Sequence, residues 1–202
     1  MMAIERTFVT QGYRNSKLDE FFKRELQRAG YAGMEIQRIP LGTKIILFVE
    51  KPGIVIGRRG KNIKEMTSIV EKEFKIENPQ IEVQEVEVPE LNPVIMAKQI
   101  AKALERGVHF RRITYSALRA IMNAGAKGVE ITISGKITGQ RARMEKFVEG
   151  TIKHSGEPAY KWVRVGYDVA EKKAGVIGVK VKIMPPETKL PDEIEIVNQG
   201  EK

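Results

Sequence analysis

Apolar and polar residues recur with helical spacing near the start of the chain. Residues 1–15 are mixed and polar, and we expect them to form a partly ordered N-terminal arm. The apolar residues that follow recur every three or four positions, which predicts a helix that begins at Ser16 and ends before Gly30. The residues expected on its inner face are Leu18, Phe21, Phe22, Leu26 and Ala29.

Two strands joined by a turn are predicted next. The segment 34–39 is followed by Pro40, Leu41 and Gly42, which include residue types that favour turns. The segment 44–49 is apolar at nearly every position. A strand that is apolar on both faces is typical of the interior of a sheet, so we expect this strand to be buried there.

A loop bracketed by two glycines lies between two further predicted helices. The first helix is short and spans 52–56, and the second runs from Lys61 to about Lys75. The apolar residues of the second helix recur at helical spacing and are expected to face a core. The four residues of the loop are Gly57, Arg58, Arg59 and Gly60.

The predicted order of elements in this half is helix, strand, strand, helix, loop, helix and strand. The last strand is predicted over 81–88, and a one-residue slip in its apolar phase predicts a bulge or twist at Gln84 and Glu85. This order resembles a K-homology (KH) domain of the second type, which we place at residues 16–88. In that family the Gly-x-x-Gly loop clamps the sugar-phosphate backbone of about four nucleotides, so the resemblance implies RNA binding by the loop.

The chemistry of the loop also favours a phosphate ligand. Glycine has no Cβ, so the backbone can approach a phosphate closely. Lys61 and Lys64 lie in the first turn of the predicted helix, where the helix dipole disfavours each cation by about 0.3–1 kcal/mol. A phosphate bound at that helix end would compensate. An ordinary solvated basic surface is the alternative, although residues 51–64 hold five Lys or Arg residues and no acid.

Two amphipathic helices are predicted at the start of the second half. Asn92 followed by Pro93 is a helix-start signal, and this helix is expected to run to about Arg106 and to end at Gly107. The next helix is predicted over 110–124. Both helices carry an apolar stripe that is expected to face a common core.

The second of these helices carries its polar residues along one stripe. The stripe consists of Arg112, Ser116, Arg119 and Asn123, with Arg111 at its edge. An ordinary solvated face is the alternative interpretation. The adjacent arginines, and the absence of any acid between Arg106 and Glu130, favour contact with nucleic acid.

Alternating segments then predict the strands of a second sheet. Val129, Ile131 and Ile133 alternate as in a half-buried strand, and the segments 162–169 and 175–184 do the same. A basic loop between strands is expected at 134–143. The cations of this loop that we expect to bind RNA are Lys136, Arg141 and Arg143.

Five motifs in one order resemble the small-subunit ribosomal protein three family, in its archaeal and eukaryotic branch. The resemblance covers about residues 5–186. The motifs are Ile56–Lys61, Phe110–Arg112, Gly125–Gly128, Ser134–Lys136 with Gly139–Ala142, and Gly175–Ile183.

This resemblance implies an α+β fold: a type II KH domain, then an α+β domain over 89–186 with two helices packed on a four-stranded sheet. It implies a cytoplasmic protein in the head of the small ribosomal subunit. The implied partners are ribosomal RNA, mRNA and the neighbouring head proteins ten and fourteen. Arg111 and Arg112 match an arginine pair that holds mRNA where it enters the subunit. Tyr115 and Ser116 stand where the bacterial pattern has further basic residues.

The net charge and the content of apolar, Cys, His and aromatic residues limit the kinds of partner and ligand that we expect. The net charge of +9 over 202 residues favours a polyanion, nucleic acid first and an anionic membrane second. No apolar run approaches the length of a membrane span, so we expect no membrane partner. With no cysteine and two distant histidines, His109 and His154, no metal site is expected. We also expect no cofactor and no small-molecule substrate, and no nucleotide-triphosphate motif is present. Aromatic residues make up 6% of the chain and none lies in the Gly57–Gly60 loop, so little base stacking is expected.

The tail 187–202 has a different character, with five acids and two lysines. We expect this acidic tail to be disordered or to lie along a protein neighbour, because acidic residues avoid RNA.

Two other functions compete with the ribosomal one. The first is a nuclease or DNA-lesion lyase. A metal nuclease would need clustered carboxylates with histidine, and aspartate is scarce; Glu82, Glu85 and Glu87 are explained by solvent-facing strand positions. A free-standing KH regulator would usually carry repeated modules, and the sequence has no internal repeat.

Overall fold

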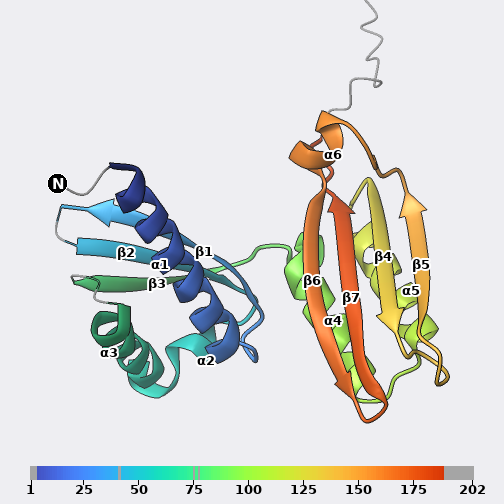
Figure 1. Ribbon diagram of the computed structural model, residues 1–202, viewed down its shortest axis with the longest axis horizontal. Coiled ribbons are helices and arrows are strands. Elements are labelled where there is room, and N and C mark those ends of the chain that lie inside the picture. Colours follow the sequence, from blue (N-terminus) through green and yellow to red (C-terminus); the bar gives the residue numbers. More distant parts are fainter. Residues whose placement is uncertain (1–3, 41, 75, 77, 189–202) are drawn as a thin grey trace, which may run out of the picture. The chain divides into compact units, whose positions relative to one another are not determined.

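The protein consists of two compact units, each with its own sheet (Figure 1). The chain divides between Pro89 and Glu90, and the two parts are called unit 1 and unit 2 below. Both units combine helices with a sheet, so the expected α+β class is confirmed. In the described part of the chain, no helix has the length and apolar character needed to span a bilayer. This computed structural model describes residues 4–40, 42–74, 76 and 78–188.

In its described residues, unit 1 has three α-helices and a three-stranded sheet of order β1-β2-β3. Strand β1 is antiparallel to β2, and β2 is parallel to β3. Ile45, Leu47 and Val49 of β2 are fully buried, so the prediction that this strand lies inside the sheet is confirmed. The elements are α1 (Ile4–Glu25), β1 (Tyr31–Ile39), β2 (Gly42–Val49), α2 (Pro52–Ile56), α3 (Lys61–Phe74) and β3 (Pro79–Glu85).

The predicted start of the first helix at Ser16 is wrong, because α1 already begins at Ile4. The added turns have almost no contact with the core, and Phe8 and Tyr13 are exposed there. No proline interrupts the segment, and one exposed glycine in a helix costs only about 1 kcal/mol relative to alanine. The helix therefore continues outward beyond the apolar stripe from which its start was predicted.

The bulge predicted at Gln84 and Glu85 is also wrong. The parallel register with β2 runs without a break from Pro79 to Glu85, where the strand ends. Val86 then donates one more backbone hydrogen bond, to the carbonyl of Val49 at 3.0 Å. The slip in apolar phase therefore marks the end of the strand. Leu41 of the predicted turn and Lys75 of the predicted helix lie outside the described residues.

Unit 2 consists of an antiparallel sheet of order β5-β4-β7-β6 and its helices. This four-stranded sheet and the two long helices were the arrangement that the resemblance implied. The elements are α4 (Pro93–Glu105), α5 (Phe110–Asn123), β4 (Gly128–Gly135), β5 (Arg143–Gly150), α6 (Glu157–Trp162), β6 (Arg164–Lys172) and β7 (Gly175–Met184).

The helices α4 and α5 cover one face of this sheet, and Figure 1 shows them behind it. The predicted starts at Pro93 and Phe110 are confirmed. The Asn92 side chain caps α4 by accepting hydrogen bonds from the backbone amides of the second and third helical residues, at 3.0 and 3.4 Å. The shared core is apolar and includes Ile100, Leu104, Ile121, Ile131 and Val181.

Two segments near the end of unit 2 differ from expectation. The strand predicted over 162–169 begins later, at Arg164, because the preceding Gly156 and Pro158 favour a short helix, α6. Of the predicted acidic tail, residues 189–202 lie outside the described residues. At its described start, the carbonyl of Thr188 accepts a hydrogen bond from the Lys127 ammonium group at 2.6 Å.

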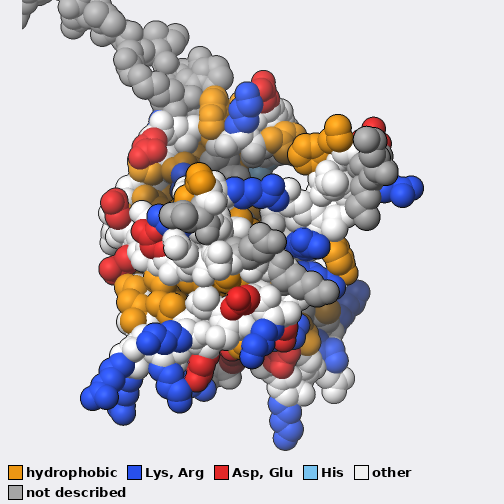
Figure 2. Space-filling view, turned by 90° about the vertical axis from the view of Figure 1, so that its left-hand side faces the viewer, with side chains coloured by type: hydrophobic (Ala, Val, Ile, Leu, Met, Phe, Trp, Pro, Cys, Tyr) orange, Lys and Arg blue, Asp and Glu red, His pale blue; other side chains and the backbone are white. Residues whose placement is uncertain are grey.

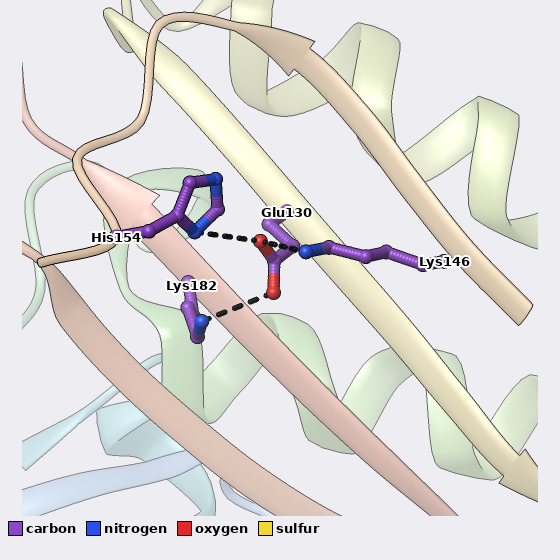
Figure 3. A network of polar contacts seen from close by, with 4 residues as sticks. All are labelled: Glu130, Lys146, His154 and Lys182. Atoms are coloured by element: carbon purple, nitrogen blue, oxygen red, sulfur yellow. Dashed lines mark ion pairs between the residues drawn. The ribbon is translucent and has the colours of Figure 1, made fainter. Parts of the chain in front are cut away.

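The sheet face opposite the helices has a buried carboxylate at its centre (Figure 3). Glu130 of β4 is 3% exposed and is surrounded by two lysines and a histidine from three other segments. Its oxygens lie 2.9 Å from Lys146 Nζ on β5, 3.1 Å from Lys182 Nζ on β7 and 3.4 Å from His154 Nδ1. Glu130 and Lys182 are direct cross-strand partners, so the network ties β5, β4 and β7 together.

The surroundings of Glu130 hold its pKa below the usual value. Burial acts to raise the pKa, but the ammonium groups of Lys146 and Lys182 lower it by more. A carboxyl whose folded-state pKa is lowered stabilises the fold above its unfolded-state pKa of 4.5. That stabilisation is lost as the pH falls through the lower, folded-state pKa.

We predict that Glu130→Gln lowers the free energy of unfolding at neutral pH by about 1–3 kcal/mol. The amide keeps the shape of the side chain but leaves Lys146 and Lys182 to repel each other. Denaturant unfolding at several pH values measures this. The difference from the original protein should shrink as the pH falls from 4.5 through the lower folded-state pKa, because below that pKa Glu130 is neutral in both states.

Glu149→Gln on β5 is the matched control, since Glu149 is exposed. It should change the unfolding free energy by no more than about 0.5 kcal/mol. Equal effects of the two substitutions, or a difference for Glu130→Gln that does not depend on pH, would contradict the role assigned to the network.

Candidate nucleic-acid interface

The Gly57–Gly60 loop joins α2 to α3 through a tightly wound turn. Gly57 has φ 69° and ψ −177°, a backbone conformation essentially restricted to glycine. Arg59 (φ 56°) and Gly60 (φ 72°) follow in the left-handed region. For a non-glycine residue such as Arg59 this conformation costs about 1–2 kcal/mol. Strain of this kind is often found where a protein binds a ligand.

Asn62 holds the loop from its inner side. Its side-chain amide donates a hydrogen bond to the carbonyl of Ile54 at 3.1 Å, which ties the start of α3 to α2. A Cβ on Gly57 would lie 2.6 Å from Asn62 Cγ, whereas a Cβ on Gly60 would meet no atom within 4 Å. Gly57 is therefore required for internal packing, and Gly60 leaves open space where a phosphate can approach the backbone.

The four predicted cations around this loop are all exposed. Arg58 and Arg59 extend from the turn, and Lys61 and Lys64 from the first turn of α3. Lys61 Nζ lies 3.6 Å from a carboxylate oxygen of Glu65, an exposed pair that contributes little stability and can open. Figure 2, which views the molecule from the left of Figure 1, shows many Lys and Arg side chains standing out from the surface. The loop thus offers bare backbone and mobile positive charge together.

The second predicted site lies on the outer side of α5 in unit 2. Arg111, Arg112 and Arg119 are exposed, as their positions on the polar stripe predicted. The guanidinium carbon of Arg111 lies 5.6 Å from the centre of the Phe110 ring, so a cation–π contact restrains this arginine. The helix contains no acidic residue, so no carboxylate within it competes with a phosphate for these arginines.

The topology of unit 2 brings further cations to the end where α5 begins. Because α5 connects directly to β4, it runs antiparallel to that strand, and its first residues lie at the end of the sheet where β4 finishes (Figure 1). The β4–β5 loop and the β6–β7 turn lie at the same end. A Cβ on Gly175 would lie 3.8 Å from Lys136 Cδ, which places these two connections beside each other.

We call this region the basic end of unit 2. Its predicted members come from α5 and the β4–β5 loop, and two lysines of the β6–β7 hairpin join them in the structure. Arg119 is two helical turns farther along α5 than Arg112. The residues of the basic end are Arg111, Arg112, Lys136, Arg141, Arg143, Lys172 and Lys173.

Lys172 and Lys173 were missed by the sequence analysis. They form a pair at the tip of the hairpin between two predicted strands. Two adjacent lysines in a predicted turn were the sequence feature that could have identified them as candidates. That these lysines lie near Arg111 and Arg112 can be inferred only once β7 is known to lie between β4 and β6. Two acids lie at this end too: a Glu105 carboxylate accepts a hydrogen bond from the backbone amide of Glu171 at 3.3 Å.

The described residues contain no group of three or more His, Cys, Asp or Glu side chains that could hold a metal ion. Of the two histidines, His109 precedes α5 and its ring lies 4.7 Å from that of Phe110. His154 contacts the Glu130 carboxylate instead. The arrangement in both units is therefore one of exposed cations and backbone, suited to binding phosphates.

Comparison with known proteins agrees with this geometry. A family model described as "KH domain" matches residues 17–91, and one described as "Ribosomal protein S3, C-terminal domain" matches residues 100–183. The resemblance of unit 1 to a KH domain is thereby confirmed.

Several archaeal proteins named small ribosomal subunit protein uS3 are similar over nearly the whole chain. The protein of Methanobrevibacter smithii is 55% identical over 96% of this chain and 78% of its own length. That of Methanocaldococcus jannaschii is 54% identical over 98% of this chain and 95% of its own. That of Methanococcus maripaludis is 52% identical over 96% and 92%.

We predict that Gly57→Ala loosens the segment 52–74 far more than Gly60→Ala does. The first substitution forces both a strained backbone and a clash with Asn62, at a cost of about 2 kcal/mol or more. The second adds only the left-handed penalty, about 1–2 kcal/mol. Hydrogen exchange of the amides in α2 and α3 measures the difference.

Gly53→Ala is the control for this comparison. Gly53 lies within α2, has no left-handed backbone, and its Cβ would meet nothing within 4 Å. Protection should stay equal or increase slightly there, since alanine favours a helix. Equal loss of protection in all three variants would show that the loop geometry is not what limits the segment.

Proposed function

The chain belongs to the family of small ribosomal subunit protein uS3, and on that premise we propose that it lines the channel through which mRNA enters the subunit. It is an RNA-binding protein of the small ribosomal subunit. In this proposal it lies in the head of the subunit in the cytoplasm, binds ribosomal RNA, and holds incoming mRNA through its phosphates.

The observation that carries the proposal is the exposed arginine pair at the basic end of unit 2. Arg111 and Arg112 lie on a helix without acids, beside the cations of two sheet connections. Arginine and lysine bind phosphates without reading bases. A channel that every mRNA must pass requires contacts of this sequence-tolerant kind.

The Gly57–Gly60 loop serves a second RNA contact in this proposal. Its support is the open space outside Gly60, the left-handed Arg59 and the four exposed cations. A KH domain uses such a loop to clamp a sugar-phosphate backbone. We assign ribosomal RNA as its partner, because a loop with a defined backbone shape is suited to an RNA backbone that stays in one place.

The neighbours in this proposal are head proteins ten and fourteen. The sheet face of unit 2 opposite α4 and α5 offers apolar contact area, since Met144, Val148, Tyr167 and Val169 are exposed there. Exposed apolar groups that gather on one face are typical of protein contacts. The charged centre of that face is neutralised by Glu130.

Sedimentation of a native extract through a sucrose gradient at high salt tests the assignment as a whole. Stoichiometric recovery of the chain in small subunits and whole ribosomes is expected. Recovery only in light fractions would contradict it, and would favour a free-standing RNA-binding regulator or an enzyme.

We predict that Arg111→Ala with Arg112→Ala weakens retention of mRNA by isolated small subunits by about 5- to 30-fold. This follows from about 0.5–1 kcal/mol for each exposed phosphate contact. The dependence of affinity on salt should also become shallower, by about 1.4 in the logarithmic slope for two lost contacts with a single strand. Filter binding over a range of salt concentrations measures both quantities.

Arg164→Ala is the matched control, because Arg164 is exposed at the opposite end of the sheet. It should leave both values unchanged, and subunit assembly should stay near normal in the Arg164 variant and in the Arg111/Arg112 variant. In the same assay, Arg58→Asp with Arg59→Asp should reduce incorporation into subunits rather than mRNA retention. Unchanged retention in the Arg111/Arg112 variant would overturn the channel role.

A further inference from the structure

Tyr115 occupies the middle of the arginine-bearing face of α5. It is 53% exposed, although it is a large aromatic residue on a helix that packs against a core. Arg112 lies one turn before it and Arg119 one turn after it, about 10.5 Å apart along the helix axis. Arg112, Tyr115, Ser116 and Arg119 together line an open hollow.

The ring of Tyr115 is held in place from one side. Its centre lies 5.4 Å from that of Phe147 on β5, at an interplanar angle of 77°. Phe147 is itself half-buried and packs against the core of unit 2 and near Phe110. In such an edge-to-face pair at most one face of the tyrosine ring is used, and the side chain is 53% exposed, so much of its surface is open to solvent.

The chemistry of the hollow selects its ligand. An aromatic face can stack with a flat, apolar ring, and two guanidinium groups and a hydroxyl can donate hydrogen bonds to phosphate or sugar oxygens. No acidic residue on α5 offers a partner for a basic ligand. A single-stranded nucleic acid carries flat rings and phosphates in this alternation, and stacking of a base on an aromatic side chain adds to phosphate binding.

We propose that Tyr115 is a stacking platform for one base of single-stranded RNA, with Arg112 and Arg119 on the flanking phosphates. The proposal rests on the proposed function of α5 and adds to it a contact with a base. Every base has an aromatic face, so the contact retains the strand without selecting its sequence.

Binding of the full chain to two fluorescent strands tests this. One is a short oligouridylate, and the other is an abasic ribose-phosphate strand of equal length. Tyr115→Ala should weaken binding of oligouridylate by about 5- to 100-fold and leave the abasic strand unaffected. Tyr115→Phe should retain the affinity, since the ring remains. Tyr160→Ala, on a tyrosine that is 89% exposed on α6, should change neither.

Ultraviolet cross-linking of oligouridylate followed by peptide mapping gives a second readout. A uridine adduct at Tyr115 is expected, and a loss of packing on Phe147 alone would not produce one. Equal affinity of Tyr115→Ala and the original protein for oligouridylate overturns the proposal, as does an equal loss for both strands. If Arg111→Ala with Arg112→Ala weakens the binding of neither strand, the proposed function is wrong. If this double variant weakens the binding of both strands but Tyr115→Ala weakens neither, only the stacking proposal is wrong.

Discussion

The burial of one side of α5 against the sheet of unit 2 determines where the protein presents its positive charge. In an amphipathic helix the apolar and polar residues lie on opposite sides. When the apolar side packs against the sheet, the arginines therefore face outward. Even the buried hydroxyl of Thr114 is satisfied within the helix, by the carbonyl of Phe110 at 2.7 Å. The inward residues are Phe110, Thr114, Ala117, Leu118 and Ile121. The direct connection to β4 then fixes the direction of the helix, and with it the end of the sheet that becomes basic.

In the proposed function, the two units bind phosphates by different physical means. In unit 1 the backbone itself is prepared, through Gly57, Arg59 and Gly60, and Asn62 maintains its shape. Such a site depends on geometry that one methyl group at Gly57 would disturb. In unit 2 the contact is made by long side chains on a rigid helix, which can adjust to a strand that moves. A fixed RNA suits the first kind of site, and a passing RNA suits the second.

Sequence reasoning succeeded where periodicity and local signals agree. It located the interior strand β2, the starts of α4 and α5, and the stripe of arginines, because a buried face leaves a regular pattern. It failed for the outer turns of α1, which have no core and therefore no apolar stripe. It also failed for the end of β3, where the slip in apolar phase marks the end of the strand, and for the start of β6, where the short helix α6 comes first. The position of Lys172 and Lys173 depends on strand order, a long-range property that local pattern does not contain.

The placement of acids decides which of the many cations remain available for RNA. At the centre of the open sheet face, Glu130 engages Lys146 and Lys182, so these lysines hold strands together. In unit 1, Glu65 makes only a long, exposed contact with Lys61, which a phosphate can replace. On α5 there is no acid at all, and Tyr115 stands among the arginines instead. The net charge of +9 therefore does not show how unevenly the charges are distributed. Cations on the sheet face of unit 2 are paired with Glu130. The arginines of α5 have no acidic partner on their own helix, and an RNA strand can reach them.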